Sequence, residues 1–298
     1  LSAAPFGPDN EAAIRAYLQP ITGDLPPRLY SRSLAGYFRS LPALPLNVGM
    51  LVGAGTLRAD AAGYQLTELA DGHFAAIHRQ MEQALSDGAL GVSLGLGYAP
   101  ECFYSTVDLI RALQPVAGTD IPVTVHMRQE GGGVAESVRE MIAVARALNC
   151  PVHISHLKAM GRDNWGKKIP QVLTLLEQAQ NEGLRVDCDV RRELAERIES
   201  GVGFDDIAKL AGWDGIYLTS LHCPEDHPYQ GHNLMEIAAL MGQDPLSSCC
   251  ELLAREHGQI TMIDFMASEE DITAILQSDL SNLISDSTYP TEGQPHPR

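Results

Sequence analysis

The chain has 298 residues, and its 45% hydrophobic content is enough for a sizeable buried core in one large domain or two small ones. Its 38 acidic residues outnumber its 21 basic ones, and the net charge of −17 argues against binding to nucleic-acid phosphates or to an anionic membrane surface. No apolar run reaches the length of about 18 residues that spans a bilayer, and the six scattered cysteines favour a reducing, cytoplasmic setting.

The first 190 residues alternate short apolar runs with helical patterns. We expect strands at residues 46–52, 89–96, 122–127, 151–156 and 185–190. We expect helices at residues 73–86, 106–116, 134–148 and 169–182, where apolar residues recur at helical spacing. Short apolar strands that alternate with helices indicate a parallel sheet covered on both faces.

The pattern changes after Val190. A charged helical segment, residues 191–200, follows the strand with no turn residue between them, although a strand buried on both faces should end in a loop. Short helices are expected at residues 205–210, 234–241, 246–257 and 269–277, and strands at 215–220 and 259–265. A last apolar run, 282–286, ends on Ser285-Asp286.

Two consecutive strands end in a histidine, His126 and His156, and Asp286 ends the last apolar run in the same way. Active sites of parallel α/β folds gather at the carboxyl ends of strands. Imidazoles and a carboxylate that converge from separate strand ends are typical of a hydrolytic zinc site. The residues alone leave a second interpretation open, in which each histidine only caps its strand.

Longer blocks of the sequence resemble a known family. Residues 88–100 (GALGVSLGLGYAP), His126-Met127-Arg128, residues 154–158 (ISHLK), Ser285-Asp286 and residues 295–298 (PHPR) are similar to N-acyl-D-amino-acid deacylases. These enzymes are the D-aminoacylase branch of the amidohydrolase superfamily. The resemblance implies an α/β fold, a (β/α)8 TIM barrel with one or two zinc ions, and hydrolysis of the amide of an N-acyl-D-amino acid.

The resemblance also implies roles for individual residues. His126 and His156 match metal ligands. Asp286 matches an aspartate at the metal that activates the catalytic water and passes its proton to the leaving amine. A small-molecule substrate is implied, and the oligomeric state stays open.

Three further residues match groups that contact the substrate. Lys158 and Arg298 match basic residues near the substrate carboxylate, and Tyr98 matches a tyrosine in the substrate pocket. Without the resemblance, Lys158 and Arg128 would be interpreted as ordinary solvated charges and Tyr98 as a packing residue.

Other histidines are expected to lie outside the site. His153 lies an odd number of positions before His156, so on one strand the two side chains should point to opposite faces. The spacing of His222, Cys223, His227 and His232 fits no zinc finger and favours an ordinary loop.

The sequence departs from the family in several places. It lacks the His-x-His pair of the first barrel strand, the bridging cysteine, and the Tyr-Pro-Tyr segment that follows the aspartate corresponding to Asp189. We therefore expect these 298 residues to be part of a longer polypeptide, without the first barrel strands and the small β-domain. Residues 1–190 are expected to be the barrel core, 191–281 a helical and mixed insertion with late barrel helices, and 282–298 the last strand and its loop.

Two alternative functions follow. The same metal chemistry opens cyclic amides, so a hydrolase of the dihydroorotase or hydantoinase kind is one alternative. The missing family residues suggest the other, a catalytically inactive barrel fragment, because His126 and His156 alone are fewer ligands than catalytic zinc usually has.

Overall fold

The computed structural model describes residues 4–22, 32–44, 47–65, 68–190, 207–258 and 260–284. The chain forms two compact units: the second comprises Gln129–Val134, Leu157–Leu173 and the described residues from Val190 onward, and the first comprises the other described residues. The first is built on parallel strands, and the second on an antiparallel strand pair. The predicted helical segment 191–200, Asp286 and Arg298 lie outside the described residues.

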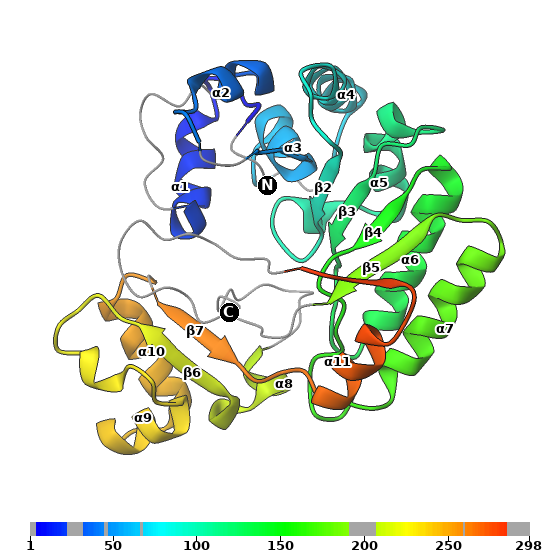
Figure 1. Cartoon of the computed structure of the whole chain (residues 1–298). Helices are drawn as coiled ribbons and strands as arrows, with labels where there is room; N and C mark the ends of the chain where they lie inside the picture. The colour runs from blue at the N-terminus through cyan, green and yellow to red at the C-terminus, as the bar shows by residue number, and fades with distance from the viewer. Residues whose placement is uncertain are drawn as a thin grey trace. The chain divides into compact units, whose positions relative to one another are not determined.

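Strands and helices alternate up to residue 190 (Figure 1). Each of the first four strands is followed by a helix before the next strand begins, as the hydrophobic pattern predicts. In chain order the elements are α1 (Glu11–Thr22), α2 (Leu34–Ser40), β1 (Val52–Gly53), α3 (Ala54–Ala62), α4 (Asp71–Ser86), β2 (Val92–Gly95), η1 (Glu101–Phe103), α5 (Thr106–Ala112), η2 (Gln114–Val116), β3 (Val123–His126), α6 (Val134–Leu148), β4 (Val152–Ile154), α7 (Lys168–Asn181) and β5 (Val186–Val190).

Strands β1 to β5 lie side by side in the order of the sequence, and their pairings are parallel. Val123 of β3 lies opposite Val92 of β2 and Val152 of β4, and all three are buried. A parallel register brings the carboxyl ends of neighbouring strands to one edge of the sheet. The ends of β3 and β4, where the two histidines were predicted, are therefore neighbours.

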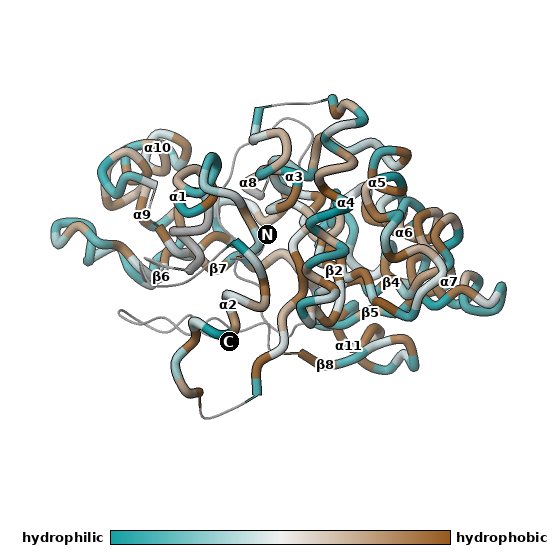
Figure 2. The backbone as a smooth tube through the Cα atoms, turned by 90° about the horizontal axis from the view of Figure 1, so that it is seen from above, coloured by the Kyte–Doolittle hydropathy of each residue, from teal (hydrophilic) through white to brown (hydrophobic). Residues whose placement is uncertain are grey.

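The helices follow from local sequence signals. In α6, the buried residues Val134, Val138, Met141 and Ala145 recur at helical spacing. Figure 2 shows hydrophobic and hydrophilic residues alternating along this helix. The bounds of α6 agree with the predicted helix at residues 134–148.

The predicted helix 106–116 is shorter than expected. It ends as α5 at Ala112, and a separate turn, η2, follows it. Pro115 lies in that turn, and a proline disfavours the helical conformation of the residue before it. Helices α1, α2 and α3 were not predicted from the sequence.

The second unit contains the antiparallel strand pair β6 and β7, with Tyr217 opposite Ile263. Its core includes the buried residues Leu218, Ile237, Leu252 and Met262. Its elements are α8 (Ile207–Ala211), η3 (Trp213–Gly215), β6 (Ile216–Ser220), η4 (His227–Tyr229), α9 (Leu234–Met241), α10 (Pro245–Arg255), β7 (Thr261–Asp264), α11 (Glu269–Leu276) and β8 (Ser281–Leu283).

Capping residues define the helix starts in this unit. The side chains of Asn233, Asp244 and Ser268 each accept a hydrogen bond from a backbone N–H in the first turn of α9, α10 and α11, respectively.

Among the described residues, no helix is both long and apolar enough to cross a membrane. The three domain boundaries expected from the sequence stay a prediction.

Candidate metal centre

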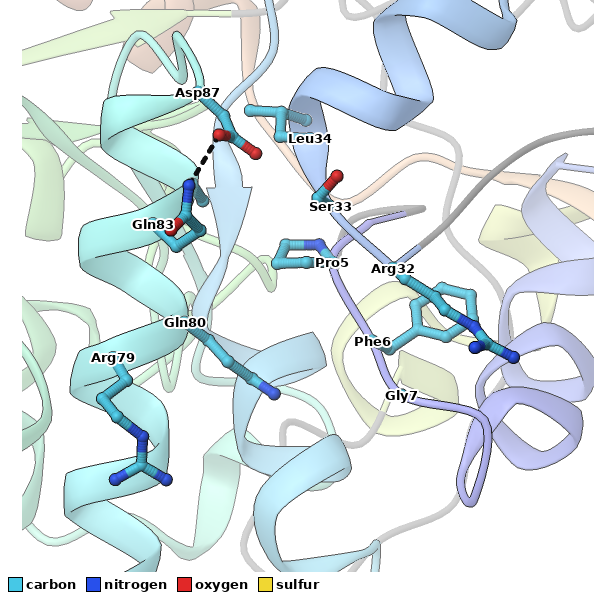
Figure 3. Close-up of a pocket in the computed structure, with 11 residues that line it drawn as sticks. Pro5, Phe6, Gly7, Arg32, Ser33, Leu34, Arg79, Gln80, Gln83 and Asp87 are labelled. Carbon is cyan, nitrogen blue, oxygen red and sulfur yellow. Dashed lines mark hydrogen bonds between the residues drawn. The ribbon is translucent and has the colours of Figure 1, made fainter.

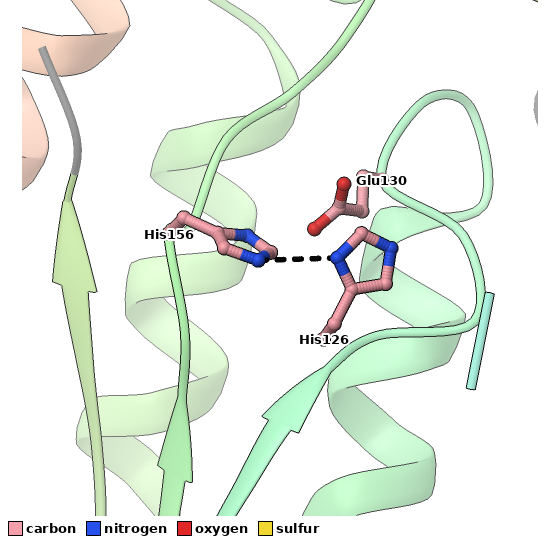
Figure 4. A group of neighbouring side chains, drawn as sticks. All are labelled: His126, Glu130 and His156. Carbon is pink, nitrogen blue, oxygen red and sulfur yellow. Dashed lines mark hydrogen bonds between the residues drawn. The ribbon is translucent and has the colours of Figure 1, made fainter. Parts of the chain in front are cut away.

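His126 and His156 face each other at the ends of neighbouring strands (Figure 4). The Nδ1 atom of His126 lies 3.1 Å from Nε2 of His156, and one of these nitrogens must donate the proton of this hydrogen bond. The ring centroids are 4.8 Å apart, with the planes at 67°. The structure thus brings together the two residues that the sequence predicted as metal ligands.

His156 lies beyond the last residue of β4, in a turn. Its φ is 41°, in the left-handed region that residues other than glycine rarely adopt. The alternation expected for His153 and His156 on one strand therefore does not apply, because β4 ends at Ile154. This corrects the sequence-based reason for placing the two side chains on opposite faces.

His153 joins two aspartates of β5. Its Nδ1 lies 2.7 Å from Oδ1 of Asp187, and its Nε2 lies 2.6 Å from Oδ2 of Asp189. The hydrogen bonds to Asp187 and Asp189 raise the pKa of His153 to about 9. The other Asp189 oxygen, Oδ1, accepts a hydrogen bond from the backbone N–H of His156.

The Tyr98 ring packs against the His126 ring. The centroids of the two rings are 4.6 Å apart, and the Tyr98 side chain belongs to the turn that follows β2. Gly97 makes this approach possible, since a Cβ atom at that position would lie only 2.9 Å from Nε2 of His126. The predicted pocket tyrosine and the predicted ligand are therefore in contact.

Arg128 fixes the segment that follows Tyr98. Its guanidinium donates to the backbone carbonyls of Cys102 and Tyr104 at 2.8 Å, and to the carboxylate of Glu140 on α6. These contacts differ from the solvated charge that the sequence alone suggested. Arg128 thereby links the end of β3 to the loop that carries the tyrosine.

Lys158 is also not a solvated charge. Its side chain is only 3% exposed, and its ammonium forms an ion pair with the equally buried carboxylate of Glu130. The backbone carbonyl of Glu130 accepts a hydrogen bond from the N–H of Met160. The Lys158 head group is therefore enclosed by protein.

Glu130 follows His126 by four positions in the sequence and was not predicted as a site residue. One ligand atom from each of His126, Glu130 and His156 lies within 4.8 Å of the other two (Figure 4). A loop glutamate shortly after a strand-end histidine was the only signal for it in the sequence.

A second acid-rich group lies in the loops of the second unit, where an ordinary loop was expected. Cys223, Asp226 and Glu256 approach one another, but Arg255 forms an ion pair with Asp226. Glu256 already accepts hydrogen bonds from the backbone N–H groups of His222 and Cys223. Burial raises the pKa of Cys223 and of Asp226, which opposes the charged forms that bind metals. These contacts are better explained as holding the loop in place than as binding a metal ion.

A cavity of about 210 Å³ opens between the N-terminal segment and α4 (Figure 3). Its wall includes Pro5, Phe6 and Gln83, and Gln83 donates a hydrogen bond to Asp87 at 2.8 Å. None of the predicted site residues lines it. It is smaller than the roughly 300–1,000 Å³ of typical ligand pockets.

Comparison with known proteins identifies relatives of this chain. The chain is 31% identical to the N-acyl-D-glutamate deacylase of Alcaligenes xylosoxydans xylosoxydans over 302 residues, which cover all of this chain and 57% of that protein. It is 30% identical to the D-aminoacylase of the same organism over 267 residues, 89% of this chain and 52% of that protein. This chain belongs to the N-acyl-D-amino-acid deacylase family of the amidohydrolases. It spans about half the length of the curated relatives that it matches. No family model matches it.

Solved structures agree with this assignment. A D-aminoacylase with a binuclear metal centre matches 95% of this chain and 56% of its own, with a TM-score of 0.76 and 26% identity. The N-acyl-D-glutamate deacylase of Bordetella bronchiseptica, in complex with zinc and a phosphonate inhibitor, matches the same shares with a TM-score of 0.77 and 26% identity. The expected α/β fold of the metal-dependent amidohydrolase type is confirmed.

The geometry of the two histidines fits a zinc ion. Two nitrogens that each lie about 2.0–2.1 Å from a tetrahedral zinc are about 3.3 Å apart. The Nδ1 of His126 and the Nε2 of His156 are 3.1 Å apart, so a small movement of either ring meets this requirement. A carboxylate such as Glu130 is also a donor that zinc accepts beside two histidines.

Proposed function

We propose that this chain acts as a zinc-dependent deacylase, which cleaves the amide bond of an N-acyl-D-amino acid to a carboxylate and a free D-amino acid. The facing pair His126 and His156, in a chain of this family, is the observation that carries the proposal. The names of the relatives, which include deacylases of N-acyl-D-glutamate and N-acyl-D-aspartate, support the substrate class.

His126 and His156 would hold the zinc ion. When bound, zinc would polarise the scissile carbonyl and lower the pKa of a water molecule to about 7. A metal binds to ring nitrogens that carry no proton, so the proton between Nδ1 of His126 and Nε2 of His156 would have to move to the other nitrogen of its ring before both atoms could hold the ion.

Asp286 is proposed as a further metal ligand and as the general base. A carboxylate within reach of the water can accept its proton and deliver it to the leaving amine. Without such a proton the amine is a poor leaving group. Asp286 lies outside the described residues, so its part in the proposal rests on the family resemblance.

The remaining residues would hold the substrate. The guanidinium of Arg298, also outside the described residues, would bind the substrate carboxylate in a two-pronged contact. Tyr98, in contact with His126, would form a wall beside the scissile bond. Lys158 would have to break its ion pair with Glu130 before it could bind the substrate carboxylate. The cost of breaking that pair would make Lys158 a weaker partner for the substrate than Arg298.

The proposed setting is the cytoplasm, with a small molecule as the substrate and neither nucleic acid nor membrane as a partner. All six cysteines are free thiols, as a reducing compartment requires. The net charge of −17 opposes attachment to phosphate-rich surfaces.

Stereoselective hydrolysis tests the proposal. The zinc-loaded protein should hydrolyse N-acetyl-D-amino acids faster than their L-isomers, and Asp286→Asn should lower kcat about 10²–10⁴-fold. Hydrolysis of the two enantiomers at equal rates would contradict the proposal. Ring opening of hydantoins or dihydroorotate, without acyl cleavage, would replace it with the cyclic-amide alternative.

A further inference from the structure

The left-handed backbone of His156 needs support, because the side chain of a residue with φ of 41° crowds its own backbone. The support comes from the next strand. The backbone N–H of His156 donates a hydrogen bond to Oδ1 of Asp189, near the end of β5. The Asp189 side chain is only 3% exposed, so water cannot easily take over this contact.

Asp189 is itself held in place. Its second oxygen, Oδ2, lies 2.6 Å from Nε2 of His153, and the far nitrogen of that ring lies 2.7 Å from Asp187. His153 and Asp187 are register partners on β4 and β5, so the ring is fixed between two strands of the sheet. With both oxygens engaged, the Asp189 carboxylate has little freedom to rotate.

The chain of contacts leads directly to the candidate metal ligands. It runs from His153 through Asp189 to the backbone of His156, and from the His156 ring to His126 at 3.1 Å. The direction of an imidazole follows the φ and ψ of its own residue. A different turn at this residue would point the ring away from its partner.

We infer that Asp189, held by His153, is a positioning residue: it fixes the left-handed turn at His156 and so orients the His156 imidazole for metal binding. This inference deepens the proposed function and rests on the metal site of that proposal. It gives the sequence pair Asp187-x-Asp189 a role that neither the strand pattern nor the family resemblance supplied.

Two variants of Asp189 separate positioning from mere packing. Asp189→Ala removes both acceptors, and we expect it to weaken zinc binding about 10–100-fold, as loss of outer contacts to metal ligands typically does. Asp189→Asn keeps an oxygen for the His156 N–H. Its amide N–H can donate to Nε2 of His153 once that ring is neutral with its proton on Nδ1 facing Asp187, a state that loss of the Asp189 charge favours, so this variant should retain nearly all of the affinity. Asp187→Ala is the matched control, since it removes a contact to His153 but none to His156.

The experiment has two readouts in the 298-residue chain. Zinc affinity is measured by competition with a chromophoric chelator. The backbone turn is measured without metal, from the NMR Cα shift and the one-bond Cα–Hα coupling of residue 156, which distinguish positive from negative φ. We expect Asp189→Ala to lose the positive-φ signature and the affinity together, while Asp189→Asn and Asp187→Ala keep both.

The outcomes are distinct. Wild-type affinity and a positive φ in Asp189→Ala would overturn the inference, as would equal losses in Asp189→Ala and Asp187→Ala. If Asp189→Ala does not fold, His153→Leu takes its place, and unchanged affinity in that variant would equally contradict the inference. A wild-type chain that binds no zinc would refute the metal site of the proposed function, whereas the turn measurement would still decide the role of Asp189.

Discussion

At the residue scale, the Lys158 ammonium and the Glu130 carboxylate form an ion pair in which each side chain is only 3% exposed. Removing one partner of a buried ion pair typically destabilises a protein by about 3–5 kcal/mol, because the remaining charge stays buried and uncompensated. We predict a loss of this size in the free energy of unfolding for Lys158→Met, measured by urea denaturation. Adding Glu130→Gln should recover part of it.

The matched control for that variant is Arg162→Met. Arg162 pairs with Asp214 at 3.0 Å, but both side chains are more than half exposed. Exposed pairs contribute about 0–1 kcal/mol, so this variant should unfold almost like the wild type. Equal stability of Lys158→Met and wild type, with only a higher KM, would instead make Lys158 a substrate-binding residue and not a structural one.

His153 predicts a specific dependence of stability on pH. Its pKa is raised from the ordinary 6.5 to about 9 by hydrogen bonds to Asp187 and Asp189. A raised pKa in the folded state means that the protonated ring stabilises the fold fully below pH 6.5, and that this contribution is lost as the pH rises through about 9. The acidic groups that face it are those two aspartates.

The measurement compares wild type with His153→Asn in urea unfolding at constant ionic strength. The difference in unfolding free energy should be largest at and below pH 6.5 and should shrink toward pH 9. A difference that stays constant across this window would mean that His153 is not charged in the folded protein.

At the element scale, the turn after β2 has to pass close to the end of β3. An added Cβ at Gly97 would lie 2.9 Å from Nε2 and 3.1 Å from Cδ2 of His126. We predict that Gly97→Ala displaces the His126 ring and weakens zinc binding by roughly tenfold or more, as disturbances around metal ligands do. Zinc competition titration measures the change.

Gly72→Ala is the control for that substitution, because a Cβ at Gly72 meets nothing within 4 Å. This residue lies in α4, where alanine is the better helix former, so the control should bind zinc like the wild type and unfold no more easily. Equal zinc affinity in Gly97→Ala and wild type would show that the His126 ring has room that the close approach does not suggest.

The sequence predicted the elements that carry a strong local pattern. Periodicity located α6 and α9 at their observed bounds and placed His126 and His156 at neighbouring strand ends. It did not locate α1, α2 and α3, which precede or follow the weak strand β1, a strand of only two residues. Pro20 lies inside α1, where a proline argues against a helix, and residues Ala54 to Ala59 of α3 are all buried, so α3 has no polar face to establish a period.

The remaining features depend on contacts between distant residues. The left-handed turn at His156 is stabilised by Asp189, 33 positions later in the sequence. The burial of Lys158 depends on Glu130, which lies in the loop after the previous strand. No local pattern encodes such pairings, because they arise only when the strands are aligned. The antiparallel pairing of β6 and β7 was unpredictable for the same reason.

At the scale of the whole molecule, the family assignment and the histidine pair support one account. The chain matches about half the length of N-acyl-D-amino-acid deacylases, carries a net charge of −17, and brings two imidazoles face to face at adjacent strand ends. Tyr98 contacts the His126 ring, Asp189 holds the backbone N–H of His156, and Arg128 fixes the segment that follows Tyr98. Such restriction is what a metal site requires of the residues around its ligands.

Zinc stoichiometry and affinity of the purified chain, compared with those of His126→Ala and His156→Ala, test the metal site most directly. His78→Ala is the control, because His78 lies on α4 and its ring contacts only the backbone carbonyl of Arg111 among the hydrogen-bond partners described. We predict tight zinc binding in wild type and His78→Ala, and its loss in each of the other two variants. Tight zinc binding that survives the combined removal of His126 and His156 would contradict the assignment of the metal to this pair.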